Sequence, residues 1–534
     1  MTQITVLNPK VIEEVEPVTP AGRLKDLKGV TVGFVDNSKM NADLFIKRLG
    51  ERLSDQYGIE VGTVVRKLAP KDLLADEDVD ALSQCGAIVQ CFGDCGTSTS
   101  MLVADAVTLE GKGKPTTTIF STAFSGAARH QAMGRGLSTL PLVEIPHPMH
   151  SASEKLVLER ADAVVDAIAQ TLTSENFKSA TVDRPLVDEE VSLEEQLAND
   201  QEFFFEQGWT DGLPVMPPTH EKVAAALSTV DRDAKEVVGV IPPCHRPATV
   251  EKIAINAVMA GCKPEYFPVV LAATEAMIHD DAKLYGAQTA TNMSTPLLIL
   301  NGPISHALGA NSGRNMLGSG NRPNATIGRA VRLVCRNIGG EIADETDVAT
   351  HGQPGKYTYC FAENEDESPW APFHTDYGFD AGESAVSVIG GASSPHNVFT
   401  YGCEHGEEVL EHFIGAVTAL GNNNIIFPSG PLLVFSPEHA FMLDRDGFSK
   451  DDIRGYIFEK GRIPLSRFVE KTVKGLHHRR SNWFETVGDP DHIGVADRAA
   501  DVMIVVAGGA GIHSLFIPTS FSLRPVVRPI LPKQ

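Results

Sequence analysis

The sequence predicts an α/β protein with two domains, and three observations support this prediction. The chain of 534 residues is too long for one ordinary hydrophobic core. Five short apolar stretches alternate with helical patterns between residues 28 and 173. An acidic, proline-containing stretch at 174–192 then separates this region from a longer one with a different pattern. We therefore expect an N-terminal arm at 1–27, a first domain at 28–173, a linker at 174–192 and a second domain at 193–534.

The first domain is expected to be a doubly wound parallel sheet of five strands, flavodoxin-like or Rossmann-like. Leu44, Ile46 and Leu49 fall near one face of its first helix. Pro70 is typical of a helix start. The expected strands are 29–37, 61–68, 86–93, 115–122 and 141–146, and the expected helices are 41–57, 70–84, 97–110, a segment ending at 133, and 151–172.

The second domain is expected to be a larger α/β domain with a mixed sheet, whose topology the pattern leaves open. A loop rich in Gly, Asn and Arg at 306–328 is too long for an ordinary connection, and such loops are usually functional or mobile. The expected strands are 237–247, 296–303, 430–437 and 502–514, and the expected helices are 194–207, 249–260, 265–280, 326–337, 407–420 and 450–460.

Charge and composition exclude several classes of function. The formal charge of −23 leaves no basic excess for broad binding to nucleic acid or to anionic membranes, although a local cationic pocket stays compatible with it. The start of the chain has no apolar signal-peptide region, and no run of 18 apolar residues predicts a membrane span. Eight irregularly spaced cysteines do not resemble a disulfide framework. We expect a cytoplasmic homo-oligomer with reduced thiols.

The stretch GAIVQCFGDCGTSTS at 86–100 predicts a strand, a tight turn and a helix start, with Cys91 and Cys95 in or beside the turn. Free backbone N–H groups and the positive end of a helix dipole favour a thiolate at such a position. Cys95 is therefore predicted to be a reactive thiolate. The alternative is that both cysteines are inert apolar residues of the core.

Polar side chains follow several strands of the predicted sheet at the edge where ligands bind in such folds. Asp36 and Lys39 are candidates to orient a substrate or to lower the pKa of Cys95. The alternative for them is a helix cap and a solvated lysine. His147, with His150 beside it, is a candidate general base, and the alternative is a pair of turn histidines next to proline. The remaining candidates for substrate binding at this edge are Asn37, Ser38, Asp94, Gly96, Thr97 and Ser98.

Three of these patterns together resemble one known family. VDNSKMNAD near the first strand, GDCGTSTS after the third and IPHP after the fifth look like the UGSC-type (seleno)protein family, over roughly residues 28–172. The resemblance places Cys95 at the selenocysteine position, which implies a nucleophilic or redox-active thiolate. Ser98 stands where the family often has a second cysteine, so Cys91 is the possible resolving residue. The second domain resembles uncharacterised domains associated with this one.

Anion binding is predicted for the long loop of the second domain. Guanidinium groups pair bidentately with carboxylates and phosphates. The alternative is a surface loop of turn-forming residues. The candidates in this loop are Arg314, Asn321, Arg322 and Asn324.

No cofactor or metal is expected. The first strand lacks the G-x-G-x-x-G fingerprint of dinucleotide sites. Cys91 and Cys95 with His147 and His150, Cys244–His245, and Cys403-x-His405 lack the paired spacing of zinc sites.

These predictions lead to a cysteine-dependent enzyme in which Cys95 attacks a small anionic substrate at the domain interface. The resemblance to a selenoprotein family favours an oxidoreductase. A lyase or hydrolase with a cysteine nucleophile is one alternative. A non-catalytic binding or sensor protein is the other.

Overall fold

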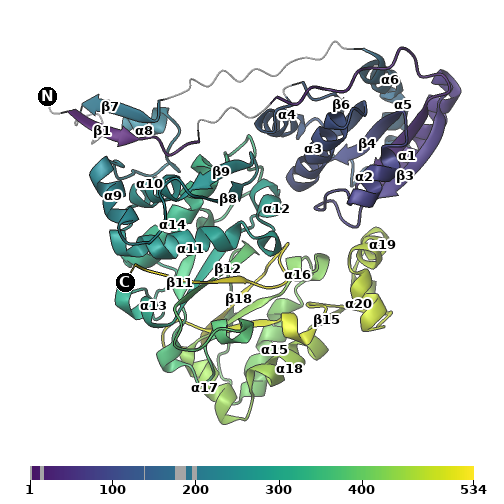
Figure 1. Cartoon of the computed structure of the whole chain (residues 1–534). Helices are drawn as coiled ribbons and strands as arrows, with labels where there is room; N and C mark the ends of the chain where they lie inside the picture. The colour runs from purple at the N-terminus through teal and green to yellow at the C-terminus, as the bar shows by residue number, and fades with distance from the viewer. Residues whose placement is uncertain (1–2, 12–16, 138, 175–187, 195–200, 534) are drawn as a thin grey trace.

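The structure is a computed structural model that describes residues 3–11, 17–137, 139–174, 188–194 and 201–533. Two α/β regions are seen in Figure 1, one built from β2 to α6 and one from β8 onwards. The α/β fold class predicted for both is confirmed.

The N-terminal region holds a five-stranded parallel sheet in the order β3-β2-β4-β5-β6. In domain numbering this is the order 2-1-3-4-5 of flavodoxin-like sheets, with a switch point between the first and third strands. The strands are β2 (Thr31–Asp36), β3 (Glu60–Arg66), β4 (Ala87–Gly93), β5 (Thr116–Ser121) and β6 (Leu142–Ile145).

Helices cover both faces of this sheet, so the central strand β4 is buried along its whole length. Ala87 and Val89 pack on the core under α1, α5 and α6, and Ile88 packs on the opposite core under α2, α3 and α4. The helices are α1 (Ala42–Tyr57), α2 (Asp76–Leu82), α3 (Gly96–Gly111), α4 (Ser125–Gly134), α5 (Glu154–Ala163) and α6 (Val165–Thr173).

Two expected helices differ from the structure. The helix predicted at 70–84 spans only Asp76–Leu82, because the N–H of Leu74 donates to the buried carboxylate of Asp105, 3.0 Å away, and residues 70–74 stay non-helical. The helix predicted at 151–172 starts at Glu154 and is interrupted at Val164.

The N-terminal arm contains a strand that packs on the C-terminal region. β1 (Gln3–Leu7) pairs antiparallel with β7 (Glu190–Glu194), and Val6 lies in the same core as Phe204 and Trp209. Figure 1 shows this pair beside α8 (Glu202–Glu206), far from β3 and β4 of the parallel sheet. Of the helix predicted at 194–207, residues 195–200 lie outside the described residues.

The C-terminal region contains two mixed four-stranded sheets instead of the one that was expected. In one sheet, in the order β11-β10-β12-β19, β10 runs parallel to β11 and antiparallel to β12. In the other, in the order β13-β18-β14-β17, β14 runs parallel to β17 and antiparallel to β18. Their strands are β10 (Thr295–Asn301), β11 (Cys360–Ala362), β12 (Ala385–Ala392), β19 (Val526–Pro529), β13 (His396–Phe399), β14 (Leu432–Phe435), β17 (Met503–Val506) and β18 (His513–Ile517). The hairpin of β8 (Val237–Ile241) with β9 (Arg246–Thr249) and the antiparallel pair of β15 (Arg462–Pro464) with β16 (His492–Gly494) form two further small sheets.

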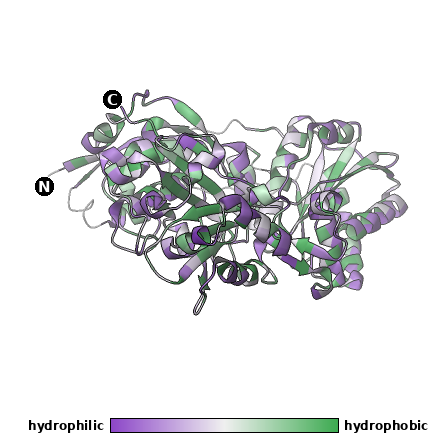
Figure 2. Ribbon diagram, turned by 90° about the horizontal axis from the view of Figure 1, so that it is seen from below, coloured by the Kyte–Doolittle hydropathy of each residue, from purple (hydrophilic) through white to green (hydrophobic). Residues whose placement is uncertain are grey.

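These sheets pack face to face and carry helices on their outer faces. Leu297 and Ile299 of β10 share a core with Leu432 and Val434 of β14, whereas Leu298 faces the helices on the other side. Hydrophobic residues accordingly concentrate on the interior strands in Figure 2. The helices on one side are α9 (His220–Leu227), α10 (Val250–Ala260), α11 (Phe267–Met277), α12 (Leu284–Thr289), α13 (Pro303–Leu308) and α14 (Arg322–Asn337). The later helices are α15 (Gly406–Val417), α16 (Asn423–Ile426), α17 (Pro437–Arg445), α18 (Lys450–Lys460), α19 (Glu470–Arg479) and α20 (Ser481–Thr486).

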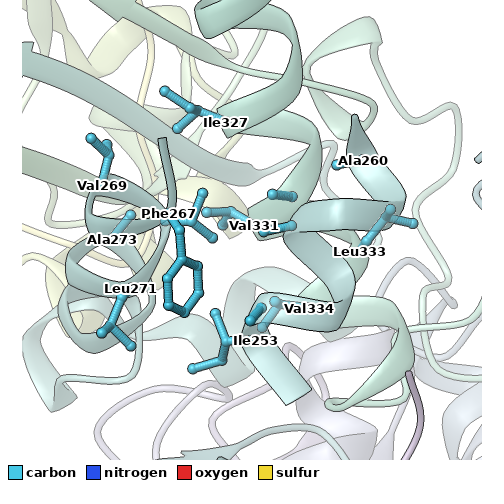
Figure 3. Packing of buried hydrophobic residues seen from close by; sticks show 14 of the residues in the cluster. Ile253, Ala260, Phe267, Val269, Leu271, Ala273, Ile327, Val331, Leu333 and Val334 are labelled. Carbon is cyan, nitrogen blue, oxygen red and sulfur yellow. The ribbon is translucent and has the colours of Figure 1, made fainter. Parts of the chain in front are cut away.

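The largest core is made by three of these helices. Figure 3 shows Ile253 of α10, Phe267 of α11 and Val334 of α14 pointing into one cluster. This packing makes α10, α11 and α14 a fixed support for the sheet beneath them. No helix among the described residues is both long and apolar enough to cross a membrane.

Candidate active site

Cys95 is the N-cap residue of α3, directly after β4, as the turn predicts. The Oγ of Ser98 accepts hydrogen bonds from the backbone N–H groups of Asp94 and Cys95, each 3.2 Å away. The same oxygen lies 3.2 Å from the Cys95 Sγ. The side chain of Cys95 in turn caps the third N–H of the helix. Ser98 therefore fixes the turn and solvates the sulfur at once.

Lys39 is the charged partner of this thiol. Its Nζ lies 3.0 Å from the Cys95 Sγ. Burial acts to raise the pKa of Cys95, but the charge and hydrogen bond of Lys39 and the hydrogen bonds of Ser98 outweigh it, so that the pKa is lowered from its ordinary value. The contact occurs at the switch point of the sheet, since Lys39 follows β2 and Cys95 follows β4.

The loop that carries Lys39 is held by its neighbours. Asn37 donates through Nδ2 to the backbone oxygen of Phe92, 2.5 Å away, next to the cysteine turn. Ser38 has a left-handed φ of 62°, and its N–H donates to the Asp36 carboxylate at 2.7 Å. Asn37, Ser38 and Asp36 thus position the loop, and we assign them no direct contact with the thiol. Burial raises the pKa of Asp36.

Asp94 binds the loop after β6. Its carboxylate accepts from the backbone N–H groups of Met149 and His150 at 3.0 Å and lies 2.9 Å from His147 Nδ1 and 2.8 Å from His150 Nδ1. Burial opposes ionisation, but the hydrogen bonds of His150, Ser121 and Met149 lower the pKa of Asp94 well below its usual range. His147 makes no hydrogen bond to Cys95 in the described residues. The structure therefore does not bring the predicted general base to the thiol, and Lys39 occupies that place.

Cys91 has a different environment from Cys95. It lies in the hydrophobic core with Phe92 and Phe45, and the register of β4 against β5 shifts after Gln90. Burial raises the pKa of Cys91 well above its ordinary value, and the nearby Asp36 raises it further. This environment fits a packing residue better than a resolving thiol.

Two segments of the C-terminal region close over the turn. The backbone oxygen of Gly286 in α12 accepts from Thr97 Oγ1 at 3.3 Å, and the Tyr285 hydroxyl donates to Ser100 at 2.8 Å. Gly96 is required at this contact, because a Cβ there would lie 1.7 Å from the backbone oxygen of Thr289. On the other side His478 of α19 lies 3.1 Å from Ser38 Oγ.

A pocket of about 150 Å³ lies between these segments and opens onto Cys95. Three cations line it. Besides Lys39 they are Lys71, whose Nζ lies 5.9 Å from the Phe521 ring centroid, and Arg479, which interacts electrostatically with Cys95 and lies 6.0 Å from the ring of Phe427. No carboxylate side chain is among its lining residues in the described part of the chain. The full lining is Lys39, Ala69, Pro70, Lys71, Cys95, Thr97, Ala290, Thr291, Asn292, Phe427, Pro428, Arg479 and Phe521.

Sequence reasoning missed Lys71 and Arg479. Lys71 follows β3 and so lies at the same sheet edge as Lys39, but a predicted helix at 70–84 hides this signal in the sequence. Arg479 stands in the basic run His477–Arg480 at the end of α19. Only the docking of the C-terminal region on the sheet edge brings that run to the thiol.

The arginine loop predicted for anion binding does not line this pocket. Its polar groups organise the start of α14, four residues earlier than expected. Asn321 caps the helix by accepting from Asn324 N–H at 3.0 Å, and Asn324 donates to the backbone of Asn311 and Met316 at 2.8 and 3.1 Å. Arg322 donates to the backbone oxygen of Gly261. Arg314 packs beside Gly509, away from Cys95. Within the described residues no group of three or more His, Cys, Asp or Glu side chains is placed to hold a metal ion.

Comparison with known proteins finds a family match over the part of the chain that contains the Cys95 turn. Residues 5–174 match the UGSC family. This N-terminal part of the chain, hereafter the UGSC region, is similar to that family. The UGSC region carries Cys95, Lys39 and Lys71, whereas Arg479 comes from the part of the chain outside the match. No curated protein matches the chain.

Proposed function

We propose that the protein is a thiolate-dependent enzyme in which Cys95 attacks a small anionic substrate in the pocket between the UGSC region and the C-terminal region. The observation that carries this proposal is the 3.0 Å contact between Cys95 Sγ and Lys39 Nζ in a pocket with two further cations. Lys71 and Arg479 favour an anionic substrate group, because guanidinium and ammonium groups pair with carboxylate and phosphate.

The covalent step follows from the groups at the turn. The lone pair of the Cys95 thiolate forms a C–S bond with an electrophilic carbonyl carbon. The π pair of the carbonyl moves to its oxygen, and Lys39 supplies the proton that this oxygen takes up. The N-terminus of α3 stabilises the negative charge on the oxygen. Where the carbonyl carbon carries a leaving group, the oxygen pair re-forms the C=O bond, the group departs with a proton, and the resulting thioester is cleaved by water to the acid and the free Cys95 thiol.

Oxidoreductase chemistry is the second candidate, because Cys95 occupies the position of selenocysteine in the resembling family. In this version the thiolate attacks one sulfur of a disulfide substrate and expels the other as a thiolate. A low-molecular-weight thiol then reduces the mixed disulfide. Cys91 in the core disfavours an internal resolving step, so an external thiol is part of this candidate. All eight cysteines are free, which supports a reducing compartment such as the cytoplasm.

A pair of alkylating agents tests the proposal. Iodoacetate and iodoacetamide react with the same thiolate but differ in charge, so Cys95 is expected to favour iodoacetate relative to a free thiol. Lys71→Met and Arg479→Gln are expected to remove that preference without abolishing the reaction with iodoacetamide. Preferential labelling of another cysteine, or no anion preference, would contradict the proposal and leave a binding or sensor protein.

The substrate is sought by intact-mass analysis after incubation with a metabolite pool. An adduct on the wild type and on Cys91→Ser, absent from Cys95→Ser, is the expected result. A mixed disulfide that an added thiol removes identifies the oxidoreductase candidate, and an acyl or alkyl adduct identifies the first one.

A further inference from the structure

A second recess adjoins the Cys95 pocket and has a different chemical character. It has a volume of about 460 Å³ and shares Thr291 and Asn292 with the Cys95 pocket. The segment after α12 therefore forms a common wall, with the thiol on one side and the recess on the other. A substrate that occupied both pockets would therefore pass along Thr291 and Asn292.

The recess is polar but carries no formal charge. None of its lining side chains in the described residues is Asp, Glu, Lys or Arg. Its polar lining groups are hydroxyls, amides and one imidazole, contributed among others by Thr291, Asn292, Thr350, His351, Ser393 and Asn423, while Met293 and Pro518 add apolar surface. Hydroxyl and amide groups both donate and accept hydrogen bonds, so they match hydroxyls of a ligand. An apolar ligand would offer no partner to those of these groups that lack one in the protein.

The amide groups of the recess are fixed before any ligand arrives. Asn292 Nδ2 donates to Asn423 Oδ1 at 2.9 Å, and Asn423 Nδ2 donates to Ser393 Oγ at 2.8 Å. Thr350 N–H donates to the backbone oxygen of Thr291 at 2.9 Å, which ties the outer wall to the shared one. The hydroxyls of Thr291 and Thr350 have no protein partner among the described residues. A preorganised surface with free hydroxyls favours binding because little side-chain freedom is lost.

We propose that this recess, hereafter the polar recess, binds an uncharged, hydroxyl-rich part of the substrate whose anionic, electrophilic end lies at Cys95. The inference rests on the proposed function, because it assumes that the anionic end occupies the Cys95 pocket. It narrows the substrate to a polyhydroxylated acid or a derivative of one. Simple fatty acids and short unsubstituted acids are disfavoured, since they offer nothing to the hydroxyls and amides of the recess.

Protection of Cys95 from iodoacetamide tests the polar recess with three carboxylates of equal charge, which are acetate, hexanoate and gluconate. Hexanoate and gluconate have chains of the same number of carbons and differ in hydroxyl groups. Gluconate is expected to protect at concentrations at least about tenfold lower than hexanoate, since each net hydrogen bond contributes roughly two- to tenfold. If gluconate protects no better than hexanoate while acetate and hexanoate still protect, the proposal that the polar recess binds hydroxyl groups is wrong and the proposed function stands. If none of the three carboxylates protects Cys95, both the role of the polar recess and the proposed function are contradicted.

A matched pair of variants locates the effect. Thr350→Val removes one hydroxyl from the recess at an exposed position, and Thr63→Val makes the same change on exposed β3. Thr350→Val is expected to weaken gluconate protection by about threefold while leaving acetate protection unchanged. Thr63→Val is expected to change neither. Equal loss for acetate and gluconate, or no loss with Thr350→Val, contradicts binding of the hydroxyls in the recess.

Discussion

Replacing Lys39 with Met tests the electrostatic basis of the site most directly. Met has a similar length and no charge, so the perturbation removes the cation 3.0 Å from the Cys95 sulfur and leaves most of the volume filled. Burial, which acts to raise the pKa of Cys95, is then opposed only by the hydrogen bonds of Ser98 and the charge of Arg479. The pKa of Cys95 is expected to move from below its ordinary value to above it.

The size of this shift follows from the contact distance. Two unit charges 3.0 Å apart interact by about 1.4 kcal/mol at the dielectric constant of water and by about 5.5 kcal/mol at an effective value of about 20. One pKa unit corresponds to about 1.4 kcal/mol, so the expected rise is about one to four units. At neutral pH this rise lowers the thiolate fraction, and with it the alkylation rate, by at least about tenfold.

The assay is the rate of Cys95 alkylation by iodoacetamide between about pH 5 and 10, measured by peptide mass spectrometry. Lys39→Arg keeps the charge and is expected to keep most of the low pKa. Lys71→Met removes a cation that has no hydrogen bond to Cys95 in the described residues, and a smaller shift is expected. If Lys39→Met and the wild type have the same inflection pH while both remain folded, Lys39 does not stabilise the thiolate and the reasoning fails.

Two further predictions concern the frame of the site. Asp94→Asn is expected to lower the melting temperature at neutral pH, because a buried carboxylate with four hydrogen-bonding partners is lost, at a cost of about 2–3 kcal/mol. The folded-state pKa of Asp94 is depressed, so its contribution to the free energy of unfolding is present above the unfolded pKa near 4 and is lost as the pH falls further. The difference in melting temperature between the wild type and Asp94→Asn should therefore narrow in acid. A difference that does not narrow would contradict this reasoning. Gly96→Ala is expected to separate α3 from Thr289 and to abolish the iodoacetate preference of Cys95. The control is Gly126→Ala in α4, where a Cβ meets nothing within 4 Å, and this variant should keep the iodoacetate preference. An unchanged preference in Gly96→Ala would refute the tight contact.

The part of the site that comes from one sheet edge could be predicted from the sequence. Parallel strands place their carboxyl ends at one edge, so the strand–helix alternation alone makes Lys39 and Cys95 candidates. The pattern does not show which polar residue at that edge meets the thiol. Asp94 accepts hydrogen bonds from the loop after β6 and contacts His147 there. This arrangement depends on the path of the Met149–His150 backbone, which the sequence pattern does not give.

The remainder depends on contacts between residues far apart in the chain. Arg479 and Asn292 reach Cys95 only because α12 and α19 dock on the UGSC region, and no local pattern encodes that docking. The arginine loop is a different case. Gly, Asn and Arg in sequence suit an anion site and a capped helix start equally well, and the hydrogen bonds of Asn321 and Asn324 show that these two residues serve the helix start. Anion binding by Arg314 and Arg322 stays a prediction.

The division of the site between two regions assigns different tasks to each. Everything that lowers the pKa of Cys95 by direct contact, namely Lys39, Ser98 and the start of α3, belongs to the UGSC region. Arg479 and the Thr291–Asn292 wall belong to the C-terminal region and touch the space where a substrate lies. Under the proposed function, the direct contacts that favour the thiolate therefore come from the UGSC region. The C-terminal region adds the charge of Arg479, which also acts on Cys95, and the wall that would select the substrate.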